Sequence, residues 1–300
     1  MAEQKNDEKP IRPASTVILV RKHRAAFQVY LLKRSSKSGF MGGLYVFPGG
    51  VVETDDWDIN SWRENIDLAL DRAAAKLGNG LNIEIICGYS IAGIRETLEE
   101  AGVFLAEDTG KSKEDFEHIS RVRLKPDLAK SWFRDEVIEG DWTLALSSLN
   151  RWSHWITPKL MNKRFDTRFF MAEMPKGQAC QPDNRETEDG VWLAPEQALT
   201  DNLSGKVPLS PPAVVTLTEL MKFKTMHALH DEMKSRQWGT PIAPRMVHTA
   251  NGPVLLEPWD PDCDTDADVD SIGYADKVVK PGVDFSRIWC DRGVWKPVNV

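Results

Sequence analysis

The chain has 300 residues, of which 41% are hydrophobic and 28% are charged, and its formal net charge is −7. This composition is typical of a globular protein, and the negative charge argues against nonspecific nucleic-acid binding through a general positive field. No apolar run in the sequence reaches the roughly 18 residues that span a bilayer. We therefore expect neither nucleic acid nor a membrane as a partner.

The four cysteines, at positions 87, 180, 263 and 290, are scattered along the chain. None of them forms a Cys-x-x-Cys pair, so the sequence predicts neither a zinc site nor a disulfide framework. We expect a cytoplasmic protein, because a reducing compartment is the usual place for cysteines without such a pattern. The sequence leaves the oligomeric state open, a homodimer included.

The N-terminal residues 1–13 are mostly polar and are expected to form a disordered tail. Residues 14–22 and 26–34 follow as two β-strands, because they are rich in β-branched and aromatic residues. A loop over 35–43 then leads into a short strand that breaks at the glycine turn of residues 47–50.

The next part of the chain predicts two helices. Ser61 and Glu64 form the Ser-x-x-Glu pattern of a capping box, which predicts a helix over 62–76. A second helix is expected over 83–101, because apolar residues recur there at helical spacing. Gly102 is suited to the C-terminal cap of that helix.

Residues 107–150 are amphipathic and are expected to be helical, including the stretches 125–140 and 143–149. Two strands are predicted over 151–158 and 163–174, on either side of a proline-containing turn.

The C-terminal third changes in character along its length. Residues 190–202 predict a strand followed by a short helix, and residues 210–236 predict one long helix opened by prolines in its first turn. From 239 to 300, prolines, glycines and short β-like runs indicate an irregular or hairpin extension packed on the main domain. The aspartates of 260–270 are spaced as in a calcium loop but lack its required glycine and final glutamate, so we expect a solvated acidic loop.

Three glutamates and an arginine crowd the end of the second predicted helix, at Arg95, Glu96, Glu99 and Glu100. Residues at i, i+3 and i+4 share a helix face, so the three carboxylates converge and repel one another. A divalent cation reverses the sign of that interaction, and Mg²⁺ prefers such hard oxygen ligands. Arg95 lies four residues before Glu99 and can brace its carboxylate. The cluster alone also fits a solvated acidic helix face, so its neighbours decide between the two interpretations.

The glycine turn and the acidic cluster together resemble the Nudix box, in which a glycine precedes a glutamate and then an Arg-Glu-x-x-Glu-Glu-x-Gly run. The matching positions are Gly50, Arg95, Glu96, Glu99, Glu100, Gly102 and Val103. The chain departs from the pattern at Asp56, where the family has its first glutamate, and at Thr97, where an aliphatic residue is usual. Residues 57–94 fill a gap that is much shorter in the family, and we interpret them as an insertion that carries its own helix.

This resemblance implies the Nudix fold, an α/β/α sandwich around a mixed central sheet, over residues 14–238. The helical insertion at 57–94 and the C-terminal extension at 239–300 are then additions to that domain. The implied reaction is hydrolysis, dependent on Mg²⁺ or Mn²⁺, of a nucleoside diphosphate linked to another group.

The resemblance also implies roles for the residues of the box. Metal ligands are expected at Glu96, Glu99 and Glu100 and at the backbone carbonyl of Gly50. The general base differs between family members, and we expect it within this cluster, at Glu99 or Glu100 first. Arg95 completes the expected catalytic group.

Two segments outside the box offer further site residues. The resemblance implies one more acidic metal ligand from a loop before a late strand, and the sequence offers Glu188 first and Glu186 second. In the later of the two strands predicted after residue 150, Arg164, Asp166 and Arg168 form a charged face. They alternate with Phe165, Thr167 and Phe169. The two arginines are suited to substrate phosphates, and ion pairing with Asp166 is an equal alternative.

The segment just before the box is similar to the coenzyme A signature of some Nudix hydrolases. The positions in register are Arg34, Ser35, Gly43, Phe47, Pro48, Gly49 and Gly50, and the departures are Tyr30, Leu32 and Gly39. The resemblance implies that Arg34, Gly49 and Gly50 bind substrate.

The insertion and the runs "GFMGGLYVFPGG", "WITP" and "RFDTRFF" are together similar to the branch that contains the peroxisomal coenzyme A diphosphatase and its bacterial relatives. That branch implies hydrolysis of CoA or acyl-CoA to 3′,5′-ADP and (acyl-)4′-phosphopantetheine. ADP-ribose, nucleotide sugars and dinucleotides stay open as substrates. A non-catalytic nucleotide-binding regulator is the remaining alternative, and the intact acidic trio argues against it.

Overall fold

The computed structural model describes residues 10–78, 80–265 and 272–299, and a seven-stranded mixed sheet lies at its centre. The strand order is β3-β2-β1-β6-β5, with β4 paired to β1 and β7 paired to β2. β1 runs parallel to β6, whereas the other pairs are antiparallel. The strands are β1 (Ile11–His23), β2 (Ala26–Arg34), β3 (Tyr45–Val46), β4 (Gly49–Val51), β5 (Asn150–Ile156), β6 (Arg164–Glu173) and β7 (Thr187–Leu193).

Helices of very different lengths connect these strands. They are α1 (Ile59–Trp62), α2 (Leu70–Ala73), α3 (Ile83–Ala101), α4 (Lys113–Val122), α5 (Trp132–Glu139), α6 (Pro195–Leu203), α7 (Pro211–Leu220) and α8 (Met226–Ser235). Short 3₁₀ or π turns are η1 (Asp55–Trp57), η2 (Arg63–Asn65), η3 (Ala74–Gly78), η4 (Leu146–Ser148) and η5 (Ala275–Lys277). No helix within the described ranges combines the length and apolar character needed to cross a membrane.

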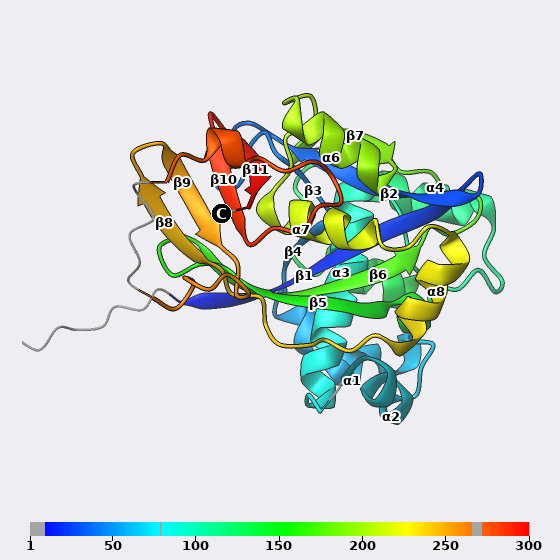
Figure 1. Ribbon diagram of the computed structural model, residues 1–300. Coiled ribbons are helices and arrows are strands. Elements are labelled where there is room, and N and C mark those ends of the chain that lie inside the picture. The colour runs from blue at the N-terminus through cyan, green and yellow to red at the C-terminus, as the bar shows by residue number, and fades with distance from the viewer. Residues whose placement is uncertain (1–9, 79, 266–271, 300) are drawn as a thin grey trace, which may run out of the picture.

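The helices cover both faces of the sheet and give three layers, as Figure 1 shows. Val17 and Leu19 of β1 belong to the apolar core shared with α3, α4 and α5. Ile18 and Val20 belong to the core shared with α6, α7 and α8. A strand buried on both faces shows this alternation. The α/β/α sandwich with a mixed sheet, expected from the sequence, is confirmed.

The first strand begins earlier than the sequence predicted. Ile11 to Pro13, expected to belong to the disordered tail, lie in β1 and pair with Arg164 to Asp166 of β6. The expectation is wrong for these residues because the parallel strand β6 pairs with them, and the local sequence does not reveal that partner. Residues 1–9 of the expected tail lie outside the described residues.

The helix predicted over 62–76 does not form, and the insertion instead contains the short pieces α1, η2, α2 and η3. The chain is extended at Ile66, where φ is −124° and ψ is 141°. There the Leu144 N–H donates to the Asn65 carbonyl at 2.7 Å, and the Asp67 N–H donates to the Leu144 carbonyl at 3.1 Å. Pairing with a distant segment thus overrides the helical spacing.

The same pairing explains a second failed prediction. Within 107–150 the helices α4 and α5 form, but residues 143–149 are not helical beyond the short turn η4. Leu144 forms isolated bridges with both Ile66 and Ala106, which hold this segment extended.

The long helix predicted over 210–236 is divided into α7 and α8. Phe223, in the break, packs edge-on against Trp152 of β5, with 6.2 Å between the ring centroids. Thr225 then caps α8, because its hydroxyl accepts the Ala228 N–H at 3.1 Å. The packing of one aromatic side chain and a new cap therefore accompany the end of the first helix and the start of the second.

The helix α3 has 19 residues, carries the second half of the box and ends as predicted, with Gly102 left-handed at φ 68°. Gly88 and Gly93 weaken a helix by about 1 kcal/mol each relative to alanine, but both permit close packing here. A Cβ at Gly88 would overlap the Trp57 ring, and one at Gly93 would lie 2.8 Å from Ser15 Oγ of β1. Gly93 lets α3 lie directly on the sheet, and Gly88 makes room for the Trp57 ring of η1.

The C-terminal extension forms a four-stranded sheet of order β11-β10-β9-β8. The strands are β8 (Arg245–Thr249), β9 (Gly252–Leu256), β10 (Arg287–Asp291) and β11 (Val294–Val298). The Ile156 N–H of β5 donates to the Ile242 carbonyl at 2.9 Å, and Asn202 Nδ2 of α6 donates to the Trp295 carbonyl at 2.8 Å. The extension is thus hydrogen-bonded to the main domain at both of its ends.

The described part of the acidic loop, residues 260–265, has a structural role. Arg287 is 2% exposed, and its Nε and Nη2 donate to Asp260 at 2.8 and 3.1 Å. Arg287 also pairs with Asp262. These carboxylates hold a buried cation, so the expectation of a merely solvated loop is wrong for them. Residues 266–270 of that loop lie outside the described residues.

Candidate active site

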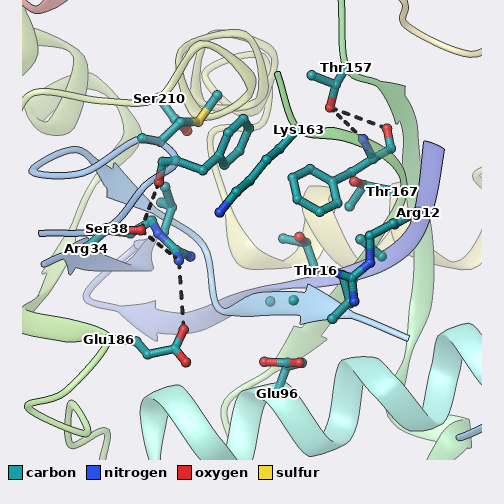
Figure 2. A pocket seen from close by; sticks show the side chains of 18 of the residues that line it. Arg12, Thr16, Arg34, Ser38, Glu96, Thr157, Lys163, Thr167, Glu186 and Ser210 are labelled. Atoms are coloured by element: carbon teal, nitrogen blue, oxygen red, sulfur yellow. Dashed lines mark hydrogen bonds and ion pairs between the residues drawn. The ribbon is translucent and has the colours of Figure 1, made fainter. Parts of the chain in front are cut away.

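A cavity of about 1150 Å³ lies between the glycine turn, the end of α3 and the β5–β6 turn. Figure 2 shows Glu96 of α3 at its floor, with Arg34 and Glu186 on one side and Arg12 on the other. Lys163 extends into the cavity from the side opposite Glu96. The volume lies slightly above the usual range for ligand pockets, so the cavity accommodates a large ligand.

The glycine turn and the acidic helix are in direct contact. The Gly49 N–H donates to Glu100 Oε2 at 2.9 Å. A Cβ at Gly50 would lie 2.5 Å from Glu96 Oε1, far inside a normal contact. Only a residue without a side chain therefore lets the Glu96 carboxylate rest against this turn.

Arg95 is buried and ties the two halves of the box together. Its Nη1 donates to Glu96 Oε1 and to Glu99 Oε2, both at 2.8 Å. Its Nη2 donates to the Val51 carbonyl at 2.8 Å and to Asp56 Oδ2 at 2.9 Å, and its Nε donates to Asp56 Oδ1 at 3.2 Å. The planar fork of the guanidinium serves all these acceptors at once, so Arg95 orients the carboxylates of the site.

Asp56 stands where the family pattern has a glutamate, and the structure gives it a defined place. It is 2% exposed, binds Arg95 through both carboxylate oxygens and also accepts the Glu53 N–H at 2.8 Å. The departure from the pattern therefore keeps a carboxylate partner for Arg95. The sequence identified this position as a departure but assigned it no role.

Glu99 is the most exposed of the three glutamates. Its side chain is 29% exposed, compared with 12% for Glu96 and 5% for Glu100. Trp132 Nε1 of α5 donates to Glu99 Oε1 at 3.0 Å, and Arg123 Nη1 donates to the Glu99 carbonyl at 2.5 Å. Neither partner was predicted from the sequence, because neither belongs to a recognisable motif.

Arg34 connects the acidic helix to the loop that precedes β7. Its Nη1 lies 3.7 Å from Glu100 Oε1, and its Nη2 lies 3.8 Å from Glu186 Oε2. Nη2 also donates to Ser38 Oγ at 3.3 Å. Because the guanidinium lines the cavity, Arg34 is placed to meet a substrate phosphate.

Burial makes the acidic cluster unfavourable without further positive charge. It raises the pKa of Glu96 to about 7 and also raises the pKa values of Glu99 and Glu100. Arg95 offsets part of this effect for Glu96 and Glu99, and Arg34 offsets part of it for Glu100. The remaining excess of negative charge favours an additional cation at this place.

The charge balance and the donor atoms fit a divalent cation. All the donors are oxygens, which Mg²⁺ and Mn²⁺ prefer. Within the described ranges no three acidic, histidine or cysteine side chains converge on one point as they stand. The reason is that Arg95 holds Glu96 and Glu99, while the Gly49 N–H holds Glu100.

Glu188, the first choice for a distant metal ligand, does not lie with these carboxylates. It accepts hydrogen bonds from Ser35 Oγ at 3.0 Å and from the Ser36 N–H at 3.3 Å. β7 already begins at Thr187, so residue 188 is part of the strand. Glu186 precedes the strand and lines the cavity, and it is the candidate that the structure brings to the site.

Arg168 also lies outside the cavity. Its guanidinium packs over the rings of Trp238 and Tyr89, at 5.3 and 5.8 Å from their centroids, on the α3 face of the sheet. Arg164, in contrast, lies at the start of β6 and lines the cavity, with its Nε donating to the Thr157 carbonyl at 3.2 Å. The predicted charged face of β6 exists, but it turns toward α3 over most of its length.

Basic side chains from several segments line the cavity around the acidic floor. They are Arg12, Arg34, Lys125, Lys130, Lys163, Arg164 and Arg185. The sequence singled out only Arg34 and Arg164, because the others come from loops and strand ends without a motif. Such a group of cations is suited to a ligand with several phosphates.

The α/β/α fold and the joined halves of the box define the class of the Nudix hydrolases. A crystal structure of a NUDIX hydrolase from Alicyclobacillus acidocaldarius shows the same fold. Its TM-score is 0.59 at 19% sequence identity, and the match covers 77% of this chain and 99% of that one.

Sequence comparison narrows this class. The family model of the NUDT19 Nudix domain matches residues 72–220. The chain is 30% identical over 280 residues to the acyl-coenzyme A diphosphatase NUDT19 of Xenopus laevis, a match that covers 79% of this chain and 73% of that protein. It is 27% identical over 307 residues to the Homo sapiens protein of the same name, with 87% and 80% covered. The chain therefore belongs to the NUDT19 family of Nudix hydrolases, and it is an enzyme of the diphosphatase class.

Proposed function

We propose that the protein hydrolyses the diphosphate linkage of CoA or acyl-CoA and releases 3′,5′-ADP and (acyl-)4′-phosphopantetheine. The observation that carries the proposal is a single cavity in which basic side chains surround the carboxylates of α3. CoA offers these cations a 3′-phosphate in addition to its diphosphate. The similarity to proteins named acyl-coenzyme A diphosphatase supports the same substrate class.

Mg²⁺ is the proposed cofactor, with Mn²⁺ as the alternative. Glu96, Glu99, Glu100 and the carbonyl of Gly50 would hold it. When bound, the metal neutralises diphosphate charge and lowers the pKa of water. Arg95 fixes the directions of the carboxylates through its hydrogen bonds to Glu96 and Glu99.

We assign the general base to Glu99 before Glu100. A base must be reached by the water that it deprotonates, and Glu99 lines the cavity whereas Glu100 is 5% exposed and bonded to the Gly49 N–H. The water oxygen forms a bond to one phosphorus of the diphosphate, the bond from that phosphorus to the bridging oxygen breaks, and the base takes the proton. Trp132 holds the Glu99 carboxylate in its orientation.

Arg34 and Arg164 are the proposed arginines for the substrate phosphates. Both line the cavity. A guanidinium binds phosphate through two parallel hydrogen bonds, which fixes the position of the phosphorus as well as neutralising its charge.

The substrate assignment is tested with a panel of compounds. The purified protein is incubated with Mg²⁺ and, separately, with CoA, acyl-CoA, ADP-ribose, nucleotide sugars and dinucleotides, and the products are identified by mass. We expect 3′,5′-ADP from CoA and acyl-CoA. Rapid turnover of another compound together with no turnover of CoA or acyl-CoA would contradict the substrate assignment. No turnover of any compound would favour a binding role without catalysis.

The catalytic assignment is tested with Glu99→Gln and Glu100→Gln. Each removes an acid from the cluster, so we expect turnover to fall by about 100-fold or more with little change in the circular dichroism spectrum. Glu84→Gln is the matched control, because Glu84 lies exposed in the first turn of the same helix. Near-normal turnover of both cluster variants would show that the metal site is assigned to the wrong residues.

We also propose a cytoplasmic location, for which the four free cysteines give support. Fractionation of cells that produce the protein measures this directly. Recovery in a membrane-bounded organelle would contradict it.

A further inference from the structure

The C-terminal extension gives the cavity a wall of distinct chemistry. The residues that the extension contributes are Pro244, Met246, Leu255 and Trp295, which together are called the extension wall here. All four are apolar. Among the described residues, every lysine, arginine, aspartate and glutamate that lines the cavity comes from positions 10–238. The Nudix domain therefore builds all of the charged part of the cavity together with apolar residues such as Phe40 and Met161, whereas the extension adds apolar residues alone.

The extension wall is continuous with the core between the two sheets. Met246 is 9% exposed and Leu255 is 4% exposed. Both belong to the same apolar cluster as Trp155 and Phe169 of the main sheet. Residues 211–212, at the start of α7, line the cavity as well. The apolar part of the cavity is thus the open edge of a packed core and not an isolated surface patch.

Hydrogen bonds hold the extension wall in place without a ligand. The Ile242 N–H donates to the His154 carbonyl of β5 at 2.7 Å, close in sequence to Pro244. Asn202 Nδ2 donates to the carbonyl of Trp295 itself at 2.8 Å. Because these contacts exist beforehand, little ordering of the wall is required when a ligand binds.

We propose that the extension wall binds the acyl-pantetheine arm of acyl-CoA and sets the preference for the acyl chain. This inference rests on the proposed function. The adenosine and the phosphates require charged or hydrogen-bonding partners, which the Nudix part supplies, whereas an acyl chain gains free energy by leaving water against apolar side chains. The arm and the adenosine leave the diphosphate on opposite sides, so a substrate with its diphosphate over α3 directs one of its two ends toward β8, β9 and β11. The apolar side chains there match the acyl end.

The first test compares two substrates in two variants. Trp295→Ala and Met246→Ala remove parts of the extension wall, and kcat/KM is measured for octanoyl-CoA and for CoA. We expect the ratio of the two values to fall about tenfold, while the inhibition constant of 3′,5′-ADP, which lacks the arm, stays the same. Trp259→Ala is the control in the same extension, because Trp259 is 49% exposed and does not line the cavity. An unchanged ratio in both wall variants would overturn the inference.

The second test uses the unaltered protein, so it does not depend on the folding of a variant. An acyl-CoA with a diazirine at the end of its acyl chain is mixed with the protein in a buffer that contains EDTA, and the mixture is then photolysed. EDTA removes divalent cations, so the compound is not hydrolysed. We expect label on peptides that contain residues 244–246, 255 or 295, and loss of that label with excess octanoyl-CoA. Label on the 125–132 loop, or no label that competes, would overturn the inference.

The two proposals fail in different ways. If the unaltered protein hydrolyses neither CoA nor any acyl-CoA, the proposed function is wrong and the inference falls with it. If it hydrolyses them but the ratio of kcat/KM for octanoyl-CoA to that for CoA is unchanged in the wall variants, only the inference is wrong.

Discussion

Replacing Arg95 by methionine tests whether one buried guanidinium holds the site together. The side chain is 8% exposed, and it donates to Val51, Asp56, Glu96 and Glu99. Methionine fills much of the same volume but offers no donor. The variant therefore removes the shared cation from the buried carboxylate of Asp56 and from the partly buried carboxylates of Glu96 and Glu99.

The size of the effect follows from that burial. Removing one partner of a buried ion pair costs about 3–5 kcal/mol, because the other charge stays uncompensated. At about 2–4 °C in Tm per kcal/mol for a chain of this class, we expect a fall of roughly 6–20 °C. Arg95→Lys keeps one charge but cannot reach Asp56 and the two glutamates together, so we expect it to be intermediate in stability and still impaired in turnover.

The assay is thermal unfolding followed by circular dichroism, with turnover of CoA measured in parallel. Arg134→Met is the matched control. Arg134 pairs with Asp55 at 3.3 Å and with Asp135 at 3.6 Å, but its side chain is 28% exposed. We expect this loss to stay below about 1 kcal/mol, as for other exposed pairs.

A result of equal Tm for Arg95→Met and Arg134→Met would refute the reasoning. It would mean that the carboxylates around Arg95 find other partners or protons at little cost. Normal turnover in Arg95→Lys would likewise show that the fork geometry of the guanidinium is not needed to position Glu96 and Glu99.

Three further predictions concern the turn, the metal and the extension. Gly50→Ala places a Cβ 2.5 Å from the Glu96 carboxylate, so we expect turnover to fall about 100-fold. Gly273→Ala is the control, because the space around Gly273 is open. Normal turnover in Gly50→Ala would contradict the contact between the turn and Glu96. Mg²⁺ added to EDTA-treated protein should raise Tm, because a ligand at 100 times its Kd adds about 2.7 kcal/mol to the free energy of unfolding. Glu96→Gln should reduce that gain. A Tm that does not change with Mg²⁺ would argue against the metal site. Glu257 is fully buried, neither carboxylate oxygen has a hydrogen-bond partner within the described ranges, and burial raises its pKa from 4.5 to about 8. Because the folded state then binds this proton more tightly than the unfolded state, its stabilising effect is complete below pH 4.5 and is lost as the pH rises to about 8, by at most about 1.4 kcal/mol per pH unit. Glu257→Gln should flatten this dependence in urea unfolding measured from pH 5 upward, and coincident pH profiles would show that the carboxyl group is not the cause.

The acidic face of α3 could be predicted because a single helix turn fixes it. Spacing alone places Glu96, Glu99 and Glu100 on one face, and the structure shows that face on the glycine turn. The position of Gly50 beside them could not be worked out from spacing, since residues 57–94 intervene. It came from the resemblance to the Nudix box.

Alternation in a strand predicts which residues share a face but not which layer covers that face. Arg164 and Arg168 belong to one charged series, yet only Arg164 lines the cavity, because it lies at the end of the strand. Glu186 and Glu188 likewise differ in whether they lie before or within a strand. The start of β7 at Thr187 decides which of them reaches the site.

Contacts between distant segments account for the other failures. The helix predicted over 62–76 is lost to backbone pairing with Leu144, and no local pattern contains that information. Trp132 reaches Glu99 from α5 in the same way. Sequence periodicity describes one segment at a time, whereas these outcomes depend on which segments meet.

The bond between Asp56 and Arg95 has a consequence for how this chain carries its insertion. The two residues stand immediately before and immediately after residues 57–94. Their ion pair joins the two ends of the insertion. Asp56 and Arg95 are therefore held together in space although residues 57–94 separate them in sequence. The two halves of the box can thus be separated in sequence by residues 57–94 and still meet in space.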